Sequence, residues 1–320
     1  MKLLNKTKTW GGSKGLFPLN VGDKSFWIFM AKRIFKNTPN VKRYAGRKLY
    51  TANEGNAILH RMISSGKPFA AGKIGDVELY IAQTYEKKKL NQFDMYRLFN
   101  NAGFFPDDEQ LMKRFGKEYC KALAGLDLVG CWFNRQEDAL LKRYGSESLI
   151  LSTIRSLEPY YFEKPWSKAL EGKKVLVINP FDSTISNQYR NHRKELFEDK
   201  SVLPEFELKV YKSVQTIGDC VDTRYSTWFE ALNAMAEDIS KIDFDIALVG
   251  CGAYGIPLCV KIKEMGKQAI HMGGATQILF GIKGKRWMNH AIISGLFNDY
   301  WCFPSGEEQP QTTKGPKAYW

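Results

Sequence analysis

Two carboxylates two residues apart stand where a predicted strand gives way to a predicted helix, in Gly75-Asp76-Val77-Glu78. At the end of a strand both side chains can point the same way, which this spacing does not allow inside a helix. Such a pair suits Mg²⁺ or Mn²⁺, which take oxygen ligands from protein and from substrate phosphates together. The alternative is structural, with Asp76 capping the helix and Glu78 complementing its dipole.

A glycine-rich loop follows a predicted buried strand and opens a helix, with the sequence Gly250-Cys251-Gly252-Ala253-Tyr254-Gly255. Glycines at this point let the backbone approach a phosphate held on free helix N–H groups. A second pair, Gly273-Gly274, follows the next strand in the same way. Together the loops predict a phosphate or nucleotide crevice lined by Gly250, Gly252, Tyr254, Gly255, Gly273 and Gly274. On pattern alone, the first loop is equally typical of a tight strand-to-helix turn.

The same G-x-G-x-x-G spacing occurs in enzymes that bind NAD. Those enzymes carry an acid near the end of the following strand, where this chain has Ile270-His271. The sequence therefore gives NAD only weak support. A NAD or S-adenosylmethionine enzyme stays open as an interpretation and would bind its cofactor without a metal.

Two further groups of side chains are candidate ligands of the same crevice. Lys283, Lys285 and Arg286 lie between glycines just downstream and suit a diphosphate, although cations also stabilise a helix C-terminus. Thr184 and Gln188 share one face of the helix predicted over 183–197 and are placed to hydrogen-bond a sugar or base. Capping by Asp182 or Ser183 explains part of that segment equally well.

The elements that must position these residues alternate between strand and helix from about residue 50. The strands are predicted at 69–74, 126–132, 174–179, 205–211, 244–249 and 268–271, and the helices at 54–65, 77–88, 108–123, 183–197, 226–240, 256–265 and from 275 onward. Strands separated by helices predict an α/β, Rossmann-like, mostly parallel sheet with helices on both faces. We expect a single main domain over 49–303, after a basic arm over 1–48 and before a loop-like tail over 304–320.

The positive charge is concentrated in that arm. The chain has a formal net charge of +13, and residues 1–48 carry Lys or Arg at twelve positions against one acid, Asp23. A basic arm favours contact with phosphate, an anionic membrane surface or nucleic acid. Its aromatic and basic segment, residues 25–36, suits a membrane interface, although an amphipathic segment of this kind more often packs on the protein's own core.

The remaining composition excludes several other classes of protein. No run of about 18 apolar residues is present, and the N-terminus does not resemble a signal peptide. The six cysteines include no C-x-x-C pair and the four histidines no H-E-x-x-H, so a zinc site is unsupported. We expect reduced thiols and a cytoplasmic protein, with peripheral contact to the inner face of a membrane as an option.

Taken together, the motifs resemble the GT-D-type glycosyltransferases and the GT-D-like proteins related to them, over roughly residues 50–320. The resemblance rests on the I-G-D-x-E turn, the N-P-F strand exit, the G-x-G-x-x-G-x-P loop, a terminal A-Y-W and, most specifically, H-M-G-G-A-x-Q-x-L-F-G-I-K-G-K-R-W over 271–287. It implies transfer of a sugar from a nucleotide diphosphate sugar, with a D-x-E motif, here Asp76 and Glu78, holding a divalent metal. Val77 stands where better-known members are expected to have Gly.

Two functions of different classes follow as expectations. The first is a metal-dependent glycosyltransferase that uses Mn²⁺ or Mg²⁺ and delivers the sugar to a glycan or lipid-linked glycan, with Asp76 and Glu78 as catalytic and metal-binding residues. The second is a non-catalytic nucleotide- or phosphate-binding protein that its basic arm docks on a membrane or nucleic acid. For the enzyme, nucleic acid is an unlikely partner.

Overall fold

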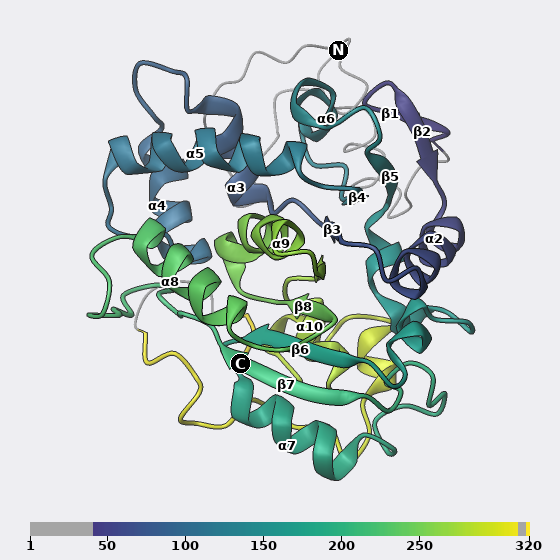
Figure 1. The fold of residues 1–320 in the computed structure, drawn as a ribbon. Coiled ribbons are helices and arrows are strands. Elements are labelled where there is room, and N and C mark those ends of the chain that lie inside the picture. The colour runs from purple at the N-terminus through teal and green to yellow at the C-terminus, as the bar shows by residue number, and fades with distance from the viewer. Residues whose placement is uncertain (1–40, 313–317) are drawn as a thin grey trace, which may run out of the picture.

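A computed structural model describes residues 41–312 and 318–320. One nine-stranded sheet forms its centre (Figure 1). The strands are β1 (Arg43–Tyr44), β2 (Arg47–Tyr50), β3 (Phe69–Gly72), β4 (Leu128–Cys131), β5 (Ile150–Thr153), β6 (Lys174–Asn179), β7 (Glu207–Lys212), β8 (Ile246–Val249) and β9 (Gln268–His271). Their order in the sheet is β1-β2-β5-β4-β3-β9-β8-β6-β7. Among these pairs β1 and β2 are antiparallel and every other pair is parallel.

Helices cover both faces of the sheet, which confirms the predicted fold class (Figure 1). The described helices are α2 (Ala52–Ser64), α3 (Asp76–Thr84), α4 (Gln92–Ala102), α5 (Glu109–Ala124), α6 (Glu137–Tyr144), α7 (Asp182–His192), α8 (Trp228–Ser240), α9 (Gly255–Glu264) and α10 (Ala275–Leu279). Short 3₁₀ turns lie at Ile154–Leu157, Pro159–Tyr161, Trp166–Leu170, Gly252–Tyr254, Lys285–Trp287 and Ile293–Leu296.

The alternation of side chains along the strands divides the core into two layers. In β6, Leu176 and Ile178 join a cluster beneath helices α3, α4, α5, α6, α8 and α9. Val175 and Val177 of the same strand face the opposite cluster, beneath α2, α7 and α10. A strand buried on both faces has no polar side to alternate with, which is why the four central residues of KVLVIN are all apolar.

The connections open a crevice at the carboxyl ends of the strands. From β6 the chain runs outward to β7, whereas from β8 it runs inward to β9, beside β3. Connections that diverge from neighbouring strands leave the strand ends between them uncovered, and ligands of open α/β sheets bind there. The motifs singled out in the sequence follow β3, β6, β8 and β9, the four strands around this point.

Several elements differ from the sequence-based expectations. Strands β1, β2 and β5 and helices α4 and α6 were not predicted, and the helix expected over 183–197 ends at His192. Residues 43–48, assigned above to the basic arm, belong to strands of the sheet or the turn between them. The aromatic segment 25–36 lies outside the described residues. Within the described part of the chain, no helix has both the length and the apolar character needed to cross a bilayer.

Candidate functional site

A cleft of about 300 Å³ opens over the carboxyl ends of β3, β6, β8 and β9. It brings together two groups of predicted residues that lie almost two hundred positions apart in the chain, the acids after β3 and the glycines after β8 and β9. The predicted site residues that line it are Asp76, Glu78, Gly250, Gly252, Tyr254, Gly273, Gly274 and Arg286.

The two acids stand in the first turn of α3, whose N-cap is Gly75. Gly75 provides no side-chain cap, and negative charge in a first helical turn is stabilised by the helix dipole. Glu78 folds back over this residue, because a Cβ added to Gly75 would lie 2.2 Å from Glu78 Oε2. Asp76 accepts a hydrogen bond from the Arg97 guanidinium and keeps 48% of its side-chain surface exposed. The turn therefore presents one open and one buried carboxyl to the cleft.

Burial sets the ionisation of the groups deepest in this turn. Burial raises the pKa of the Glu78 carboxyl, although the Lys73 ammonium opposes the shift. Burial also lowers the pKa of Lys73, and there Glu78 provides the largest opposing effect. Each group thus favours the charged form of the other, and a bound cation would favour ionised Glu78 further.

The loop after β8 depends on glycine for close packing. A Cβ on Gly250 would lie 2.7 Å from both Asn179 Nδ2 and Thr276 Oγ1. Asn179, the last residue of β6, donates from Nδ2 to the Gly250 carbonyl at 3.0 Å and accepts from Phe181 N with Oδ1. The segment at the end of β6, Asn179-Pro180-Phe181, and the glycine loop after β8 are therefore hydrogen-bonded to each other at the floor of the cleft.

Gly255 was predicted to line the crevice, but it lies outside the cleft lining and packs against His271, which does line it. A Cβ at Gly255 would lie 2.0 Å from Cε1 of His271, so glycine is needed where the imidazole packs. The His271 Nδ1 lies 3.2 Å from the Val249 carbonyl, which can only accept, so Nδ1 carries the proton. Burial, assisted by the nearby Lys73 charge, lowers the pKa of His271 to about 3. The imidazole that lines the cleft is therefore neutral at physiological pH.

The C-terminal residues form another wall. A Cβ on Gly274 would lie 2.5 Å from the ring of Tyr319, so the ring packs directly on this glycine. Tyr319 accepts a 2.8 Å hydrogen bond from Arg286 Nη1 with its hydroxyl and a 3.1 Å bond from Gln277 with its carbonyl. The tail predicted as a loop thereby fixes the cation of Arg286 at the cleft.

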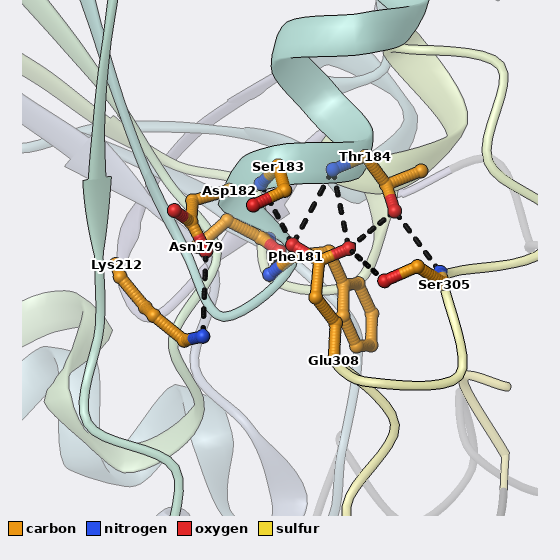
Figure 2. Close-up of polar contacts among 8 residues, drawn as sticks. All are labelled: Asn179, Phe181, Asp182, Ser183, Thr184, Lys212, Ser305 and Glu308. Atoms are coloured by element: carbon orange, nitrogen blue, oxygen red, sulfur yellow. Dashed lines mark hydrogen bonds and ion pairs between the residues drawn. The ribbon is translucent and has the colours of Figure 1, made fainter.

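Thr184 and Gln188 do not reach the cleft, which corrects the expectation that they bind a sugar or base. Figure 2 shows the Thr184 hydroxyl bonded to the Glu308 carboxylate and accepting from Ser305 N. Gln188 is 1% exposed and donates to the carbonyls of Gly281 and Tyr300. Helical spacing placed both on one face correctly, but that face packs on the protein's own C-terminal segment.

Lys283 and Lys285 also lie outside the cleft lining. The Lys283 ammonium lies 5.6 Å from the centre of the Phe297 ring, and its backbone N–H donates to the Cys302 carbonyl. Lys285 is exposed. Of the three predicted cations, Arg286 alone lines the cleft.

Two cations of the cleft were missing from the sequence-based site. Lys73 follows β3 and stands three residues before Asp76, so its place after a predicted strand is visible in the sequence. Arg97 comes from α4, a polar helix that was not predicted. The cleft thus combines three cations, Lys73, Arg97 and Arg286, with two acids.

The carboxylates of the cleft fit a divalent metal that takes some of its ligands from the protein and the others from a substrate. Within the described residues, no cluster of three or more His, Cys, Asp or Glu side chains is arranged to hold a metal. Asp76 and Glu78 offer carboxylate oxygens at one turn of the cleft. Mg²⁺ characteristically uses one or two carboxylates together with substrate phosphates, so two acids meet its requirement when a diphosphate is bound.

A family model shows which group of proteins this chain belongs to. The family model of the GT-D-like group, described as a GT-D fold-like domain, matches residues 51–279. The chain belongs to the GT-D-like family. This confirms the resemblance noted from the sequence, and membership supports the glycosyltransferase activity expected from it.

Solved structures and curated proteins were compared as well. One structure, described as "The highly conserved domain of unknown function 1792 has a distinct glycosyltransferase fold", shares 14% identity with a TM-score of 0.42, covering 72% of this chain and 80% of that chain. A selenomethionine-substituted structure of domain of unknown function 1792 shares 15% identity with a TM-score of 0.41, covering 73% and 80%. No curated protein matched.

Proposed function

We propose that this GT-D-like protein is a metal-dependent glycosyltransferase that uses a nucleotide diphosphate sugar as donor. The observation that carries the proposal is the convergence of the Asp76–Glu78 turn and both glycine loops on one cleft. Glycine-lined strand exits suit phosphate groups, and acids beside them suit a cation bound with those phosphates. Membership of the GT-D-like family agrees with this chemistry.

Asp76 and Glu78 are the residues that would hold Mn²⁺ or Mg²⁺. The ion, when bound, supplies positive charge to the diphosphate as it leaves the sugar. Asp76 is the main ligand, because its carboxylate is half exposed. Glu78, buried at the same turn, is the second ligand, and as an alternative it accepts the proton of the attacking acceptor hydroxyl.

The side chains around the acids orient the donor. Arg286 presents a guanidinium that is fixed by Tyr319 and can form two parallel bonds with phosphate oxygens. Neutral His271 lines the cleft without adding charge. We propose a glycan or lipid-linked glycan as acceptor, with the basic arm making peripheral contact with the inner face of a membrane; residues 1–40 of the arm lie outside the described residues.

The test is hydrolysis of nucleotide sugars with UDP, GDP and CDP leaving groups, measured with Mn²⁺ and with EDTA. We expect the wild type to release free nucleoside diphosphate with Mn²⁺ only, and Asp76→Asn to lose about 100-fold or more of that rate. Asp107→Asn, which changes an exposed acid outside the cleft, is the matched control. Equal rates for wild type and Asp76→Asn would remove the assignment. Nucleotide binding without turnover under all conditions would favour the non-catalytic binding protein instead.

A further inference from the structure

Lys73 lines the cleft and packs against Trp132 and Gly273. It follows the last residue of β3, and its ammonium lies 4.6 Å from the centre of the Trp132 ring. A Cβ on Gly273, which has a φ of +60°, would lie 2.6 Å from Lys73 Cε. The stem of Lys73 therefore runs between an indole ring and a glycine whose missing side chain makes room for it.

Within residues 41–312 and 318–320, the Lys73 ammonium has no hydrogen-bond acceptor or carboxylate partner. Among the described residues, no hydrogen bond or ion pair to its Nζ occurs. Two other cations illustrate the contrast, since Arg97 bonds Asp76 and Lys263 bonds Asp127. An ammonium carries three donors, and leaving them unmatched in a half-buried position costs free energy. Such a position is stable when an anionic ligand supplies the acceptors.

Three acids and one further cation surround Lys73, and none of the acids pairs with it. Glu78 and Asp76 on α3, Glu158 between two 3₁₀ turns, and Arg286 all act electrostatically on Lys73. The acids do not pair with it directly, and Arg286 adds a second positive charge nearby. Lys73 and Arg286 both line the cleft, so a ligand with several negative oxygens can contact both.

We infer that Lys73 binds the diphosphate of the donor and contributes to its affinity even when no metal is present. The inference rests on the proposed function for the identity of the ligand, but the anion site itself follows from the unmatched ammonium. Lys73 replaces Lys283 and Lys285, which lie outside the cleft lining, as the lysine that neutralises the leaving group. As the sugar–oxygen bond breaks, the electron pair stays on the diphosphate, and Lys73 stabilises the added charge.

The experiment measures binding of inorganic pyrophosphate by calorimetry in EDTA, with the full chain. We expect the wild type to bind and Lys73→Gln to bind at least tenfold more weakly, with Lys73→Arg retaining most of the affinity. Lys285→Gln, which changes an exposed lysine outside the cleft lining, is expected to match the wild type. Melting temperatures identify any variant that fails to fold, and Lys73→Met then serves as a second replacement.

The outcomes separate this inference from the proposed function. Equal affinity for wild type and Lys73→Gln, or the absence of pyrophosphate binding to the wild type in EDTA, overturns the inference. Binding that depends on Lys73, without turnover of any nucleotide sugar, keeps the anion site and removes the transferase. With Mn²⁺ and a donor that is turned over, Lys73→Gln is expected to lower kcat at least tenfold, which a purely structural lysine would not do in a variant of unchanged melting temperature.

Discussion

The Arg97 guanidinium of α4 donates a hydrogen bond to Oδ2 of Asp76, the first residue of α3. The arginine side chain is 14% exposed, and its guanidinium also lies near the rings of Tyr80 and Phe93. These contacts restrict the side chain to its position beside Asp76. One oxygen of the proposed metal ligand is therefore occupied by a protein cation. A metal that binds Asp76 must compete with that cation, or use the other oxygen beside it.

This relationship predicts the effect of Arg97→Met on metal binding. Without the guanidinium, both oxygens of Asp76 become available, and we expect the free protein to bind Mn²⁺ about three- to tenfold more tightly. Electron paramagnetic resonance of free Mn²⁺ measures the change. Arg143→Met removes an exposed arginine that pairs with Glu86 and is the control. Unchanged affinity in Arg97→Met would contradict competition between Arg97 and the metal for Asp76.

Tyr319→Phe is predicted to affect donor binding more than stability. The variant keeps the ring on Gly274 but removes the 2.8 Å bond from Arg286. The bond is exposed, so we expect less than about 0.5 kcal/mol of lost stability. Because Arg286 is no longer held, the KM for the donor should rise a few-fold while kcat changes little. Tyr300→Phe, on an exposed tyrosine outside the cleft lining, is the control, and an unchanged donor KM in Tyr319→Phe would contradict the role.

Glu308→Gln is predicted to destabilise the fold. Figure 2 shows the Glu308 carboxylate at the N-terminus of α7, where it accepts from the backbone N–H groups of Ser183 and Thr184. An amide removes the charge and turns a donor toward groups that also donate, so we expect a loss of about 1–3 kcal/mol in the free energy of unfolding. Urea denaturation measures it. Glu307→Gln, one residue earlier and exposed, should be neutral; equal stability of the two variants would refute the capping role.

Glu158 is predicted to make stability depend on pH. Burial raises the pKa of its carboxyl from 4.5 to about 7, against the opposing charges of Lys73, Arg155 and Arg286. Between these pH values the folded protein binds more protons than the unfolded chain. The contribution of Glu158 to the free energy of unfolding is therefore fully present below pH 4.5 and is lost as the pH rises through 7. In the wild type this effect lowers the free energy of unfolding by about 1–3 kcal/mol between pH 4.5 and 8, and Glu158→Gln should abolish that decrease.

The measurement for Glu158 is urea denaturation of the wild type and the variant at pH 4.5, 6 and 8. Glu163→Gln, on an exposed glutamate of the same segment, controls for the general effect of removing a negative charge. Identical pH dependence of wild type and Glu158→Gln would show that the carboxyl titrates in its ordinary range.

The sequence by itself determined the central strands and the turns that follow them. Apolar runs such as KVLVIN, bounded by Gly172 and Pro180, predict buried parallel strands, and parallel strands put all their carboxyl ends on one edge. The acids after β3 and the glycines after β8 and β9 were therefore placed correctly at one edge, and the cleft brings them together. These are local patterns, in which a few neighbouring residues carry the whole signal.

Only the tertiary structure decided which polar side chains face the cleft. Glu308 bonds Thr184 across 124 positions of sequence, and Arg286 bonds Tyr319 across 33. No local pattern reports such partners, so Thr184 was predicted as a ligand contact and Tyr319 was not. Lys73 was missed for the same reason, because its place against Trp132 and Gly273 in the cleft depends on segments distant in sequence. The physical reason is that backbone pattern fixes where a strand ends, while burial and long-range contacts fix where each side chain points.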